Sequence, residues 1–420
     1  MKTTGVLLFS IIAATAVLLQ VGCQKAADAT DIKDQAKFDW PVWRGPDASG
    51  VSRETDWNAE WNDSGPPVLW KANIGVGFAS MAVADGRVFA MGYADGIDTV
   101  YCFSAADGKE LWKHSYPCQL VDNLHEGGPA ATPTIDGDTV YTISKEGQLF
   151  AFNVANGEVR WELRFPELLE VKMPEWGFSG SALIVGEKLI VEAGRTCALD
   201  KKTGKLIWKT DAFKPGYGSP TLFKSDGEEL IAVLNNEFLM VVRLSDGEIL
   251  AKQKWETSYA TSACTPLALG DGNLFISTGY GKGCLLAHYK AGTLTPIYEN
   301  KNIRSHMANV VPVAGNLYGV DGQSNHQSRC KVVCMDEKTG DVRWEQAGFG
   351  CGNVFAAGDR LIIFSDEGEL VTAKVDATSY QEISRAQILE GKCWTVPVLS
   401  NQRIFCRNAT GDLVCLDVSQ

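Results

Sequence analysis

The stretch Ala198-Leu199-Asp200-Lys201-Lys202-Thr203-Gly204-Lys205-Leu206-Ile207-Trp208 decides the fold of this chain. A small and an apolar residue precede an aspartate, a glycine turn follows, and a tryptophan stands four residues after the glycine. The pattern returns from Cys334-Met335-Asp336 through Gly340 to Trp344, and more briefly at Gly108 with Trp112 and Gly157 with Trp161. Self-similarity of this kind indicates a repeat architecture.

Two further turn markers recur with the same spacing. One is a turn before a hydrophobic pair, about 45 residues apart, at Gly86, Gly137, Gly186, Gly227, Gly272, Gly315, Gly358 and Asn401. The other follows a few residues later, at Gly96, Gly147, Gly194, Asn236, Gly283, Gly322, Gly368 and Gly411. Short alternating runs between these turns predict four strands per repeat, which is the composition of a propeller blade.

The eighth copy of the repeat is split between the two ends of the chain. The sequence ends with Cys415-Leu416-Asp417-Val418-Ser419-Gln420, where a turn glycine and a tryptophan should follow. The missing half is Leu69-Trp70-Lys71, which matches Leu111-Trp112-Lys113. We therefore expect an all-β fold: an eight-bladed β-propeller over residues 68–420, whose last blade is closed by an N-terminal strand so that no sheet edge stays open.

The repeat also carries a family resemblance. Ala-x-Asp-x-x-Thr-Gly-x-x-x-Trp at 198–208 resembles the tryptophan-docking motif of the PQQ-like (quinoprotein alcohol dehydrogenase-like) β-propeller repeat family. Trp40-Pro41-Val42-Trp43-Arg44-Gly45-Pro46, in the N-terminal segment 38–67, resembles the BamB-like lipoprotein branch of that family. The resemblance spans residues 68–420 and implies the fold directly, whereas function has to come from a site.

The first residues predict export and a lipid anchor. Lys2 precedes an apolar run over 6–19 that is too short for a membrane span, so residues 1–22 are interpreted as a signal peptide. Leu18-Leu19-Gln20-Val21-Gly22-Cys23 resembles a lipobox, with Gln20 departing from the usual leucine. We expect lipid attachment at Cys23, a tether over 23–37, and a location on the periplasmic face of the envelope as an outer-membrane lipoprotein. The alternative is an ordinary secretory signal.

Charge and cysteine content narrow the choice of function. The net charge of −12 argues against a nucleic-acid partner, because phosphate binding needs a basic face.

Of 12 cysteines, Cys102, Cys334 and Cys415 occupy the repeat position held elsewhere by alanine, so they are predicted to be small buried residues. No two cysteines are adjacent, whereas many quinoprotein alcohol dehydrogenases carry an adjacent pair. The pairing of the other cysteines is left open.

The loops that lead into the first strand of each blade should cluster around the axis at one end. We call them the leading loops. Most combine glycine with an aromatic or charged residue, which is typical of a small-molecule or peptide site. The predicted rim residues are Trp176, Tyr217, Tyr259, Arg304, His306, Phe349, Lys392 and Trp394. The competing interpretation is that these are ordinary turns whose aromatic side chains pack the wall.

We interpret the chain as a non-catalytic, envelope-anchored protein-binding or scaffold lipoprotein, similar in architecture to BamB. Its predicted partner is an envelope protein or a small ligand at the propeller mouth. One alternative is a PQQ- and Ca²⁺-dependent dehydrogenase, and another is a carbohydrate or peptide sensor. Trp176 or Trp394, Arg304, Lys392, Glu126, Glu175 and Asn309 are suitable types for PQQ and Ca²⁺. However, the leading loops lack an aspartate base and the histidines lack metal-ligand spacing, so we expect no catalytic residue, cofactor or metal.

Overall fold

The computed structural model describes residues 1–2 and 38–419. The predicted signal peptide beyond its first two residues, the lipid site at Cys23 and the predicted tether lie outside the described residues. Among the residues that are described, no helix is long and apolar enough to cross a membrane.

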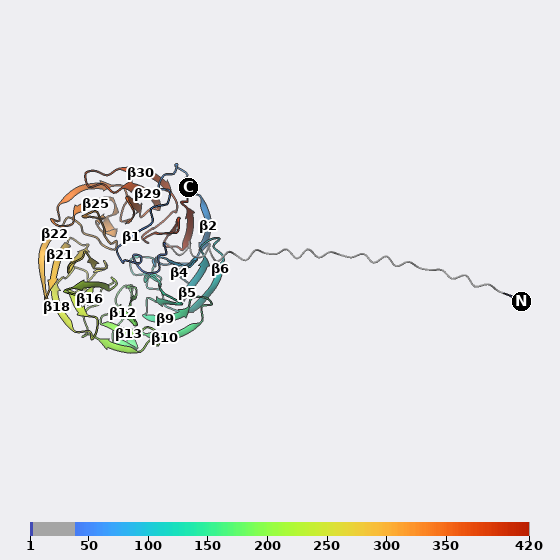
Figure 1. The fold of residues 1–420 in the computed structure, drawn as a ribbon, viewed down its shortest axis with the longest axis horizontal. Helices are drawn as coiled ribbons and strands as arrows, with labels where there is room; N and C mark the ends of the chain where they lie inside the picture. Colours follow the sequence, from blue (N-terminus) through green and yellow to red (C-terminus); the bar gives the residue numbers. More distant parts are fainter. Residues whose placement is uncertain (3–37, 420) are drawn as a thin grey trace.

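Within residues 38–419 the strands form eight sheets around one axis, with four consecutive antiparallel strands in a typical blade (Figure 1). The first blade contains β3 (Ala82–Ala84), β4 (Arg87–Ala94), β5 (Ile97–Ser104) and β6 (Glu110–Pro117). The second contains β7 (Thr134–Asp136), β8 (Thr139–Ile143), β9 (Gln148–Asn153) and β10 (Val159–Arg164). The third contains β11 (Leu183–Val185), β12 (Lys188–Glu192), β13 (Thr196–Asp200) and β14 (Leu206–Lys209). The fourth contains β15 (Thr221–Ser225), β16 (Glu228–Leu234), β17 (Phe238–Arg243) and β18 (Ile249–Lys254).

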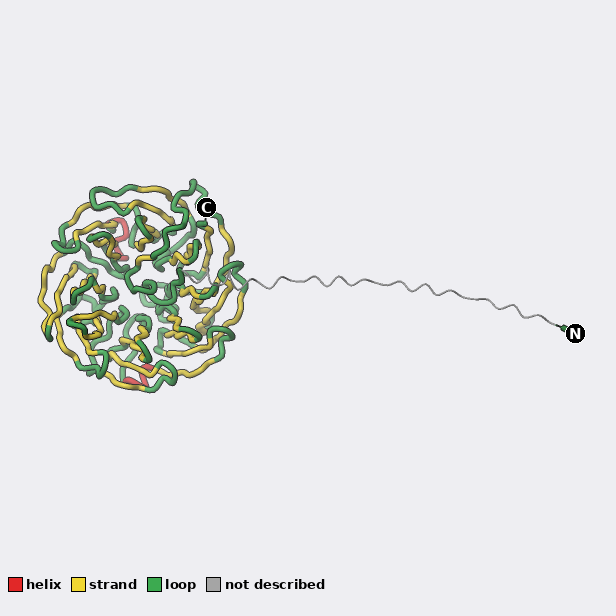
Figure 2. The backbone as a smooth tube through the Cα atoms, in the orientation of Figure 1, coloured by secondary structure: helices red, strands yellow, loops and turns green. Residues whose placement is uncertain are grey.

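The remaining blades continue the ring in chain order. The fifth contains β19 (Leu267–Ala268), β20 (Asn273–Thr278), β21 (Gly283–Lys290) and β22 (Thr293–Asn300). The sixth contains β23 (Val311–Val313), β24 (Asn316–Asp321), β25 (Lys331–Asp336) and β26 (Val342–Ala347). The seventh contains β27 (Asn353–Ala357), β28 (Arg360–Phe364), β29 (Glu369–Lys374) and β30 (Glu382–Gln387). Helix is confined, within the described residues, to α2 (Phe165–Leu169) and the 3₁₀ helix η1 (Ser324–Arg329), the two short red segments of Figure 2.

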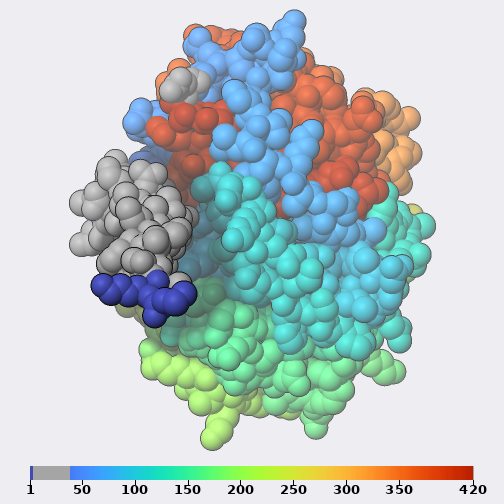
Figure 3. All heavy atoms as spheres, turned by 90° about the vertical axis from the view of Figure 1, so that its right-hand side faces the viewer, coloured from blue at the N-terminus to red at the C-terminus, as the bar shows by residue number. Residues whose placement is uncertain are grey.

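The eighth blade is assembled from both ends of the chain, as the split repeat predicts. β31 (Val398–Ser400), β32 (Arg403–Arg407) and β33 (Asp412–Asp417) are completed by β2 (Val68–Asn73), which runs antiparallel to β33 with Trp70 opposite Cys415. In Figure 3 the blue N-terminal residues lie against the red C-terminal ones at this seam. The expected all-β, eight-bladed propeller closed by an N-terminal strand is confirmed.

The repeat tryptophans bind each blade to the next one. The Trp208 ring lies over Gly247 of the following blade, and its indole N–H donates to the carbonyl of Leu244 at 3.1 Å. A Cβ at Gly247 would stand 2.5 Å from the ring, and its φ of +80° also favours glycine. The same indole-to-carbonyl bond, at 2.7–3.1 Å, is made by Trp70, Trp112, Trp161 and Trp344. The pattern at 198–208 therefore encodes blade docking.

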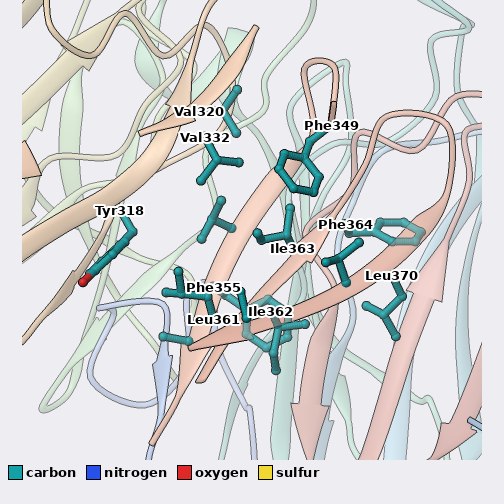
Figure 4. Packing of buried hydrophobic residues seen from close by; sticks show 14 of the residues in the cluster. Tyr318, Val320, Val332, Phe349, Phe355, Leu361, Ile362, Ile363, Phe364 and Leu370 are labelled. Carbon is teal, nitrogen blue, oxygen red and sulfur yellow. The ribbon is translucent and has the colours of Figure 1, made fainter. Parts of the chain in front are cut away.

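Apolar side chains fill the space between neighbouring blades. Figure 4 shows Tyr318, Val320 and Val332 of the sixth blade facing Phe355, Ile363 and other residues of the seventh, and all of these are buried. The small residue of the repeat lies opposite the docking tryptophan: Cys102, Ala151, Ala198, Cys334 and Cys415 pair with Trp112, Trp161, Trp208, Trp344 and Trp70. The predicted role of these three cysteines as small buried residues is thus confirmed.

The N-terminal segment, drawn in blue in Figure 1, crosses the centre of the ring before it reaches β2. Trp40 pairs with Val83 of the first blade, and the Trp43 indole donates to Thr265 Oγ1 at 3.0 Å. β1 (Val51–Ser52) then pairs in parallel with β27 of the seventh blade. The segment therefore ties blades on opposite sides of the axis together.

Candidate functional site at the mouth of the propeller

One end of the propeller, which we call the mouth, is formed by two sets of loops. Because the first two strands of each blade are antiparallel, the leading loop lies beside the connection between the second and third strands. Backbone bridges between Val76 and Tyr93 and between Ser305 and Gly322 show this arrangement directly. Side chains at the mouth can therefore come from sixteen loops rather than the eight leading loops alone.

A cleft of about 870 Å³ opens at the mouth. It is lined by Leu124, Glu175, Trp176, Ser258, Tyr259, Tyr280, Gly281, Arg304, Gly322, Gln323, Asn325, His326 and Arg329. Three of the predicted rim residues, Trp176, Tyr259 and Arg304, are among them. Its volume is within the range of small-ligand and peptide pockets, about 300–1,000 Å³.

Aromatic rings run along the wall of this cleft. Tyr259 contacts Tyr280 at 4.8 Å between ring centroids, and Tyr280 contacts His306 at the same distance. On the other wall Trp176 meets Tyr217 edge to face at 5.7 Å. Tyr217 and His306 thus support the lining rings from behind, and burial raises the pKa of Tyr217 to about 12. Five of the eight predicted rim residues are brought together here.

Trp176 is positioned from below by a buried lysine. Lys145 is 3% exposed, and its ammonium group donates to the carbonyl of Trp176 at 2.8 Å. Burial lowers the pKa of Lys145 to about 8. This contact fixes the backbone of the leading loop and leaves the Trp176 side chain half-buried at the cleft.

Arg304 is held in place by a carboxylate that sequence reasoning missed. Asp321, at the end of β24, accepts from Arg304 Nε at 2.8 Å and from an Nη at 2.5 Å, and also from the Arg304 backbone N–H at 2.7 Å. This bond raises the pKa of Arg304, and the Asp321 carboxylate is buried while the guanidinium is partly exposed. The cleft therefore presents a fixed guanidinium whose charge is largely neutralised.

His306 is kept neutral by its surroundings. Burial lowers its pKa from 6.5 to about 4. Its Nδ1 lies 3.1 Å from Ser324 Oγ and 3.4 Å from the Ser324 backbone nitrogen, which donates to it. His306 thus acts as a hydrogen-bond partner that secures the start of η1, which carries three lining residues.

Lys392 and Trp394 form a separate cluster near the ring seam. Lys392 Nζ lies 4.4 Å from the Trp394 ring centroid and pairs with Glu126 at 2.8 Å. Phe78 stacks on Trp394 at 5.7 Å and contacts His125 at 5.4 Å. The predicted rim is therefore two clusters, of which only the one at Trp176 and Tyr259 lines the cleft.

The structure does not place Phe349 on the rim. Its side chain is 1% exposed, packs against Tyr380 at 5.8 Å, and lies under the guanidinium of Arg385 at 5.1 Å. Gly348 and Gly350 on either side have positive φ, so the backbone turns there and directs the ring into the blade interface. For this residue the competing interpretation, core packing, is correct.

Most of the lining residues that were missed lie outside the leading loops. Leu124, which is 87% exposed, is an exception in the leading loop of the second blade, whereas Tyr280 follows β20. Gln323, Asn325, His326 and Arg329 come from the long connection between β24 and β25. This connection, from Gly322 to Cys330, is longer than the corresponding connection in the second blade, where a single tight turn joins β8 to β9. Its extra length was the sequence signal that could have indicated these residues.

The residues suggested for PQQ and Ca²⁺ are engaged in other contacts. Arg304 and Lys392 are paired with carboxylates, and Asn309 Oδ1 accepts from the backbone N–H of Thr265 at 2.8 Å. Within residues 38–419 no three His, Cys, Asp or Glu side chains gather closely enough to hold a metal ion. These residues do not fit a PQQ site, because their charged and amide groups already have partners within the protein.

Comparison with known proteins places this geometry in context. A protein family described as outer membrane protein assembly factor BamB matches residues 52–215 and 99–346. The outer membrane protein assembly factor BamB of Shewanella oneidensis is 23% identical over 377 residues, which cover 83% of this chain and 88% of that protein.

Two solved structures share the fold. BamB from Moraxella catarrhalis superposes with a TM-score of 0.60 at 17% identity, covering 84% of this chain and 98% of that one. Quinohemoprotein alcohol dehydrogenase from Comamonas testosteroni gives 0.55 at 12% identity, covering 94% and 82%. Because both a BamB and a dehydrogenase share the ring of blades, the likeness concerns the fold alone.

Proposed function

Because the chain belongs to the family of the outer membrane protein assembly factor BamB, we propose that it is a non-catalytic scaffold that binds a protein partner in the cell envelope. In this proposal the partner takes part in outer-membrane protein assembly, the process for which the relatives of this chain are named. Lipid attached to Cys23 holds the propeller at the periplasmic face of the outer membrane. The propeller then presents its mouth to the partner.

The observation that carries the proposal is the chemistry of the cleft. Tyr259 and Leu124, which both line the cleft, are 62% and 87% exposed. The neighbouring Arg304 is fixed by Asp321. Exposed aromatic and aliphatic groups around a preorganised arginine are typical of protein-binding hot spots. A peptide segment or loop of a partner would bury them with little reorganisation.

Site-specific photo-crosslinking in the native host tests the proposal. A benzoylphenylalanine in place of Tyr259 should cross-link to a component of the outer-membrane assembly machinery. The matched control is Ile207, which is 48% exposed on the outer strand β14, far from the mouth loops. Equal cross-linking from both positions, or none from position 259, would overturn the cleft as the binding site.

The dehydrogenase alternative has its own test. Incubation of the purified protein with PQQ and Ca²⁺, followed by dye-reduction assays over alcohols and sugars, should give no turnover above background. Reproducible turnover that is lost on chelation would instead support the enzyme.

A Cys23→Ser variant, expected to be absent from the lipid-labelled membrane fraction, tests the anchor separately.

A further inference from the structure

The interface between the fourth and fifth blades lacks a docking tryptophan. Ala251 of β18 lies opposite Val241 in the fourth blade. This is the register position of Trp208, which lies opposite Ala198 in the third blade. Ala251 is half-buried, and β18 lies next to β22 of the fifth blade at the outer edge of the propeller (Figure 1). A methyl group therefore stands where the preceding interface carries an indole.

The glycine that should receive the indole is uncovered. Gly292, in the turn between β21 and β22, corresponds to Gly247 in the fourth blade. A Cβ at Gly292 would meet only the carbonyl oxygen of Leu250, at 3.8 Å, whereas a Cβ at Gly247 would lie 2.5 Å from the Trp208 side chain. A tryptophan would lie equally close, at 2.6–2.7 Å, to a Cβ at Gly108, Gly157 and Gly204. Among these five glycines Gly292 alone is exposed, so its surface is free for an incoming side chain.

The carbonyl group that would accept the indole N–H is present in the fifth blade. In the second blade the acceptor of the Trp112 N–H is the carbonyl of Val154, whose own backbone N–H donates to the first hairpin of that blade. Tyr289 is the equivalent residue, because its N–H donates to the Gly272 carbonyl in the first hairpin of the fifth blade. The Tyr289 carbonyl accepts from Ser225 Oγ at 3.2 Å and has a second lone pair. Ser225 and Gly272 both line a cavity of about 480 Å³ between the two blades, so this carbonyl lies beside open space.

The seventh blade shows how a docking position without a tryptophan can be filled. Ser384 occupies that position, opposite Thr372. The Trp61 backbone N–H donates to Ser384 Oγ at 2.9 Å, and the Trp61 side chain packs on the core of the sixth to eighth blades. The Val418 carbonyl, at the acceptor position of the eighth blade, receives the Asn58 backbone N–H at 2.7 Å. A tryptophan-bearing segment from elsewhere in the chain thus compensates for the small residue.

We propose that the surface over Gly292 is a docking site for a tryptophan side chain of a partner protein. The indole would lie on Gly292 beside Ala251, and its N–H would donate to the Tyr289 carbonyl. Docking there would bury a large flat apolar side chain and satisfy its single polar group.

The tryptophan has to come from a different protein. Residues 3–37, outside the described chain, contain no tryptophan, and their single aromatic residue is Phe9 in the predicted signal peptide. Within residues 38–419 no tryptophan is exposed, so a second copy of this chain does not offer one either. Gly292 lies in a turn between third and fourth strands, at the end of the propeller opposite the mouth. The inference therefore does not rest on the function proposed for the cleft.

Photolabelling of the purified full chain with 4-azidoindole tests the proposal. Trypsin releases Ala251 in peptide 244–252 and Gly292 in peptide 291–301. We expect the label on these two peptides and its loss when excess indole is present. A capped Gly-Trp-Gly peptide should compete with the label, whereas Gly-Ala-Gly should not. The proposal is wrong if the label is confined to mouth peptides such as 173–188, which carries Trp176, or if the tryptophan peptide does not compete.

Matched variants sharpen the result. Ala251→Trp supplies the missing indole from within the chain, so it should abolish labelling of peptide 291–301 and raise the melting temperature. Ile207→Trp adds a tryptophan at an exposed position of β14 and should leave the labelling unchanged. Undiminished labelling of a folded Ala251→Trp protein would overturn the proposal. If that variant fails to fold, the wild-type peptide map and the peptide competition decide.

Discussion

Trp208 and Trp176 show how one residue type serves two different regions of this molecule. Trp208, between blades, lies on Gly247 and donates its indole N–H to a carbonyl of the next blade. Trp176, at the mouth, is fixed through its backbone carbonyl by Lys145 while its ring edges the cleft. The first is surrounded by repeat residues and the second by irregular loops. Residues that keep the repeat build the ring, and residues that depart from it form the surface for recognition.

The largest effect should come from opening the ring at its seam. Deleting Pro66–Lys71 removes most of β2, the docked Trp70 and the partner strand of β33. The free energy of unfolding should fall by more than about 3–5 kcal/mol, which is the cost of removing a single buried aromatic side chain. A typical domain is stabilised by about 5–15 kcal/mol, so this loss would be a large part of its stability. We expect a large fall in melting temperature and aggregation, measured by circular dichroism and light scattering.

A single change in the same strand provides the control. Leu69 is 41% exposed, so Leu69→Ser should alter the free energy of unfolding by no more than about 0.5 kcal/mol. A deletion protein that melts and dissolves like wild type would show that β2 does not close the ring.

Exchanging each of the two tryptophans for alanine should separate their roles. Trp208→Ala should destabilise the protein by about 3–5 kcal/mol, because it empties a blade interface and leaves the Leu244 carbonyl without its donor. Trp176→Ala should lower partner capture about tenfold, a loss of about 1.4 kcal/mol, with a smaller change in stability. Urea unfolding and quantitative capture of the cross-linked partner measure the two effects. Equal destabilisation by both changes would make Trp176 a core residue.

Substitution of Arg407 should show how much the hydrogen bonds at the junction of the eighth and first blades contribute to stability. Its fully buried guanidinium donates to the carbonyls of Ala79, Met91 and Gly75 across the junction of the eighth and first blades. Arg407→Met keeps the aliphatic volume and leaves these carbonyls without donors, so we expect a loss of about 2–3 kcal/mol. Arg407→Lys retains one donor group, so its free energy of unfolding, measured with urea, should lie between those of the wild type and Arg407→Met. If Arg407→Met is as stable as the wild type, water replaces the guanidinium as the donor to these carbonyls.

The smallest effect concerns pH at the mouth. His306 has a pKa near 6.5 when unfolded and about 4 when folded, so the folded state favours the neutral ring. Its contribution is complete above pH 6.5 and is lost as the pH falls toward 4. Between pH 7 and 5 the wild type should lose about 2 kcal/mol more stability than His306→Gln. A pH profile of stability for His306→Gln that is identical to the wild-type profile would refute the assignment.

The sequence by itself determined the ring. The recurring turn glycines, the small residue opposite the tryptophan and the split eighth copy specify blade count, strand register and closure, because each depends on contacts that repeat from one blade to the next. The spacing of Gly204 and Trp208 predicts docking on any blade that carries it. Predicting these features required no knowledge of which distant loops meet.

The mouth was decided by the tertiary structure. Residue type indicated Trp176, Tyr259 and Arg304, but the contact of Arg304 with Asp321 and the core position of Phe349 depend on how particular loops fold. The contact of Trp176 with Tyr217 likewise requires the third and fourth blades to lie side by side. These contacts are made by irregular loops, so no periodic signal records them. Their geometry exists only once the ring has closed and fixed the distances between blades.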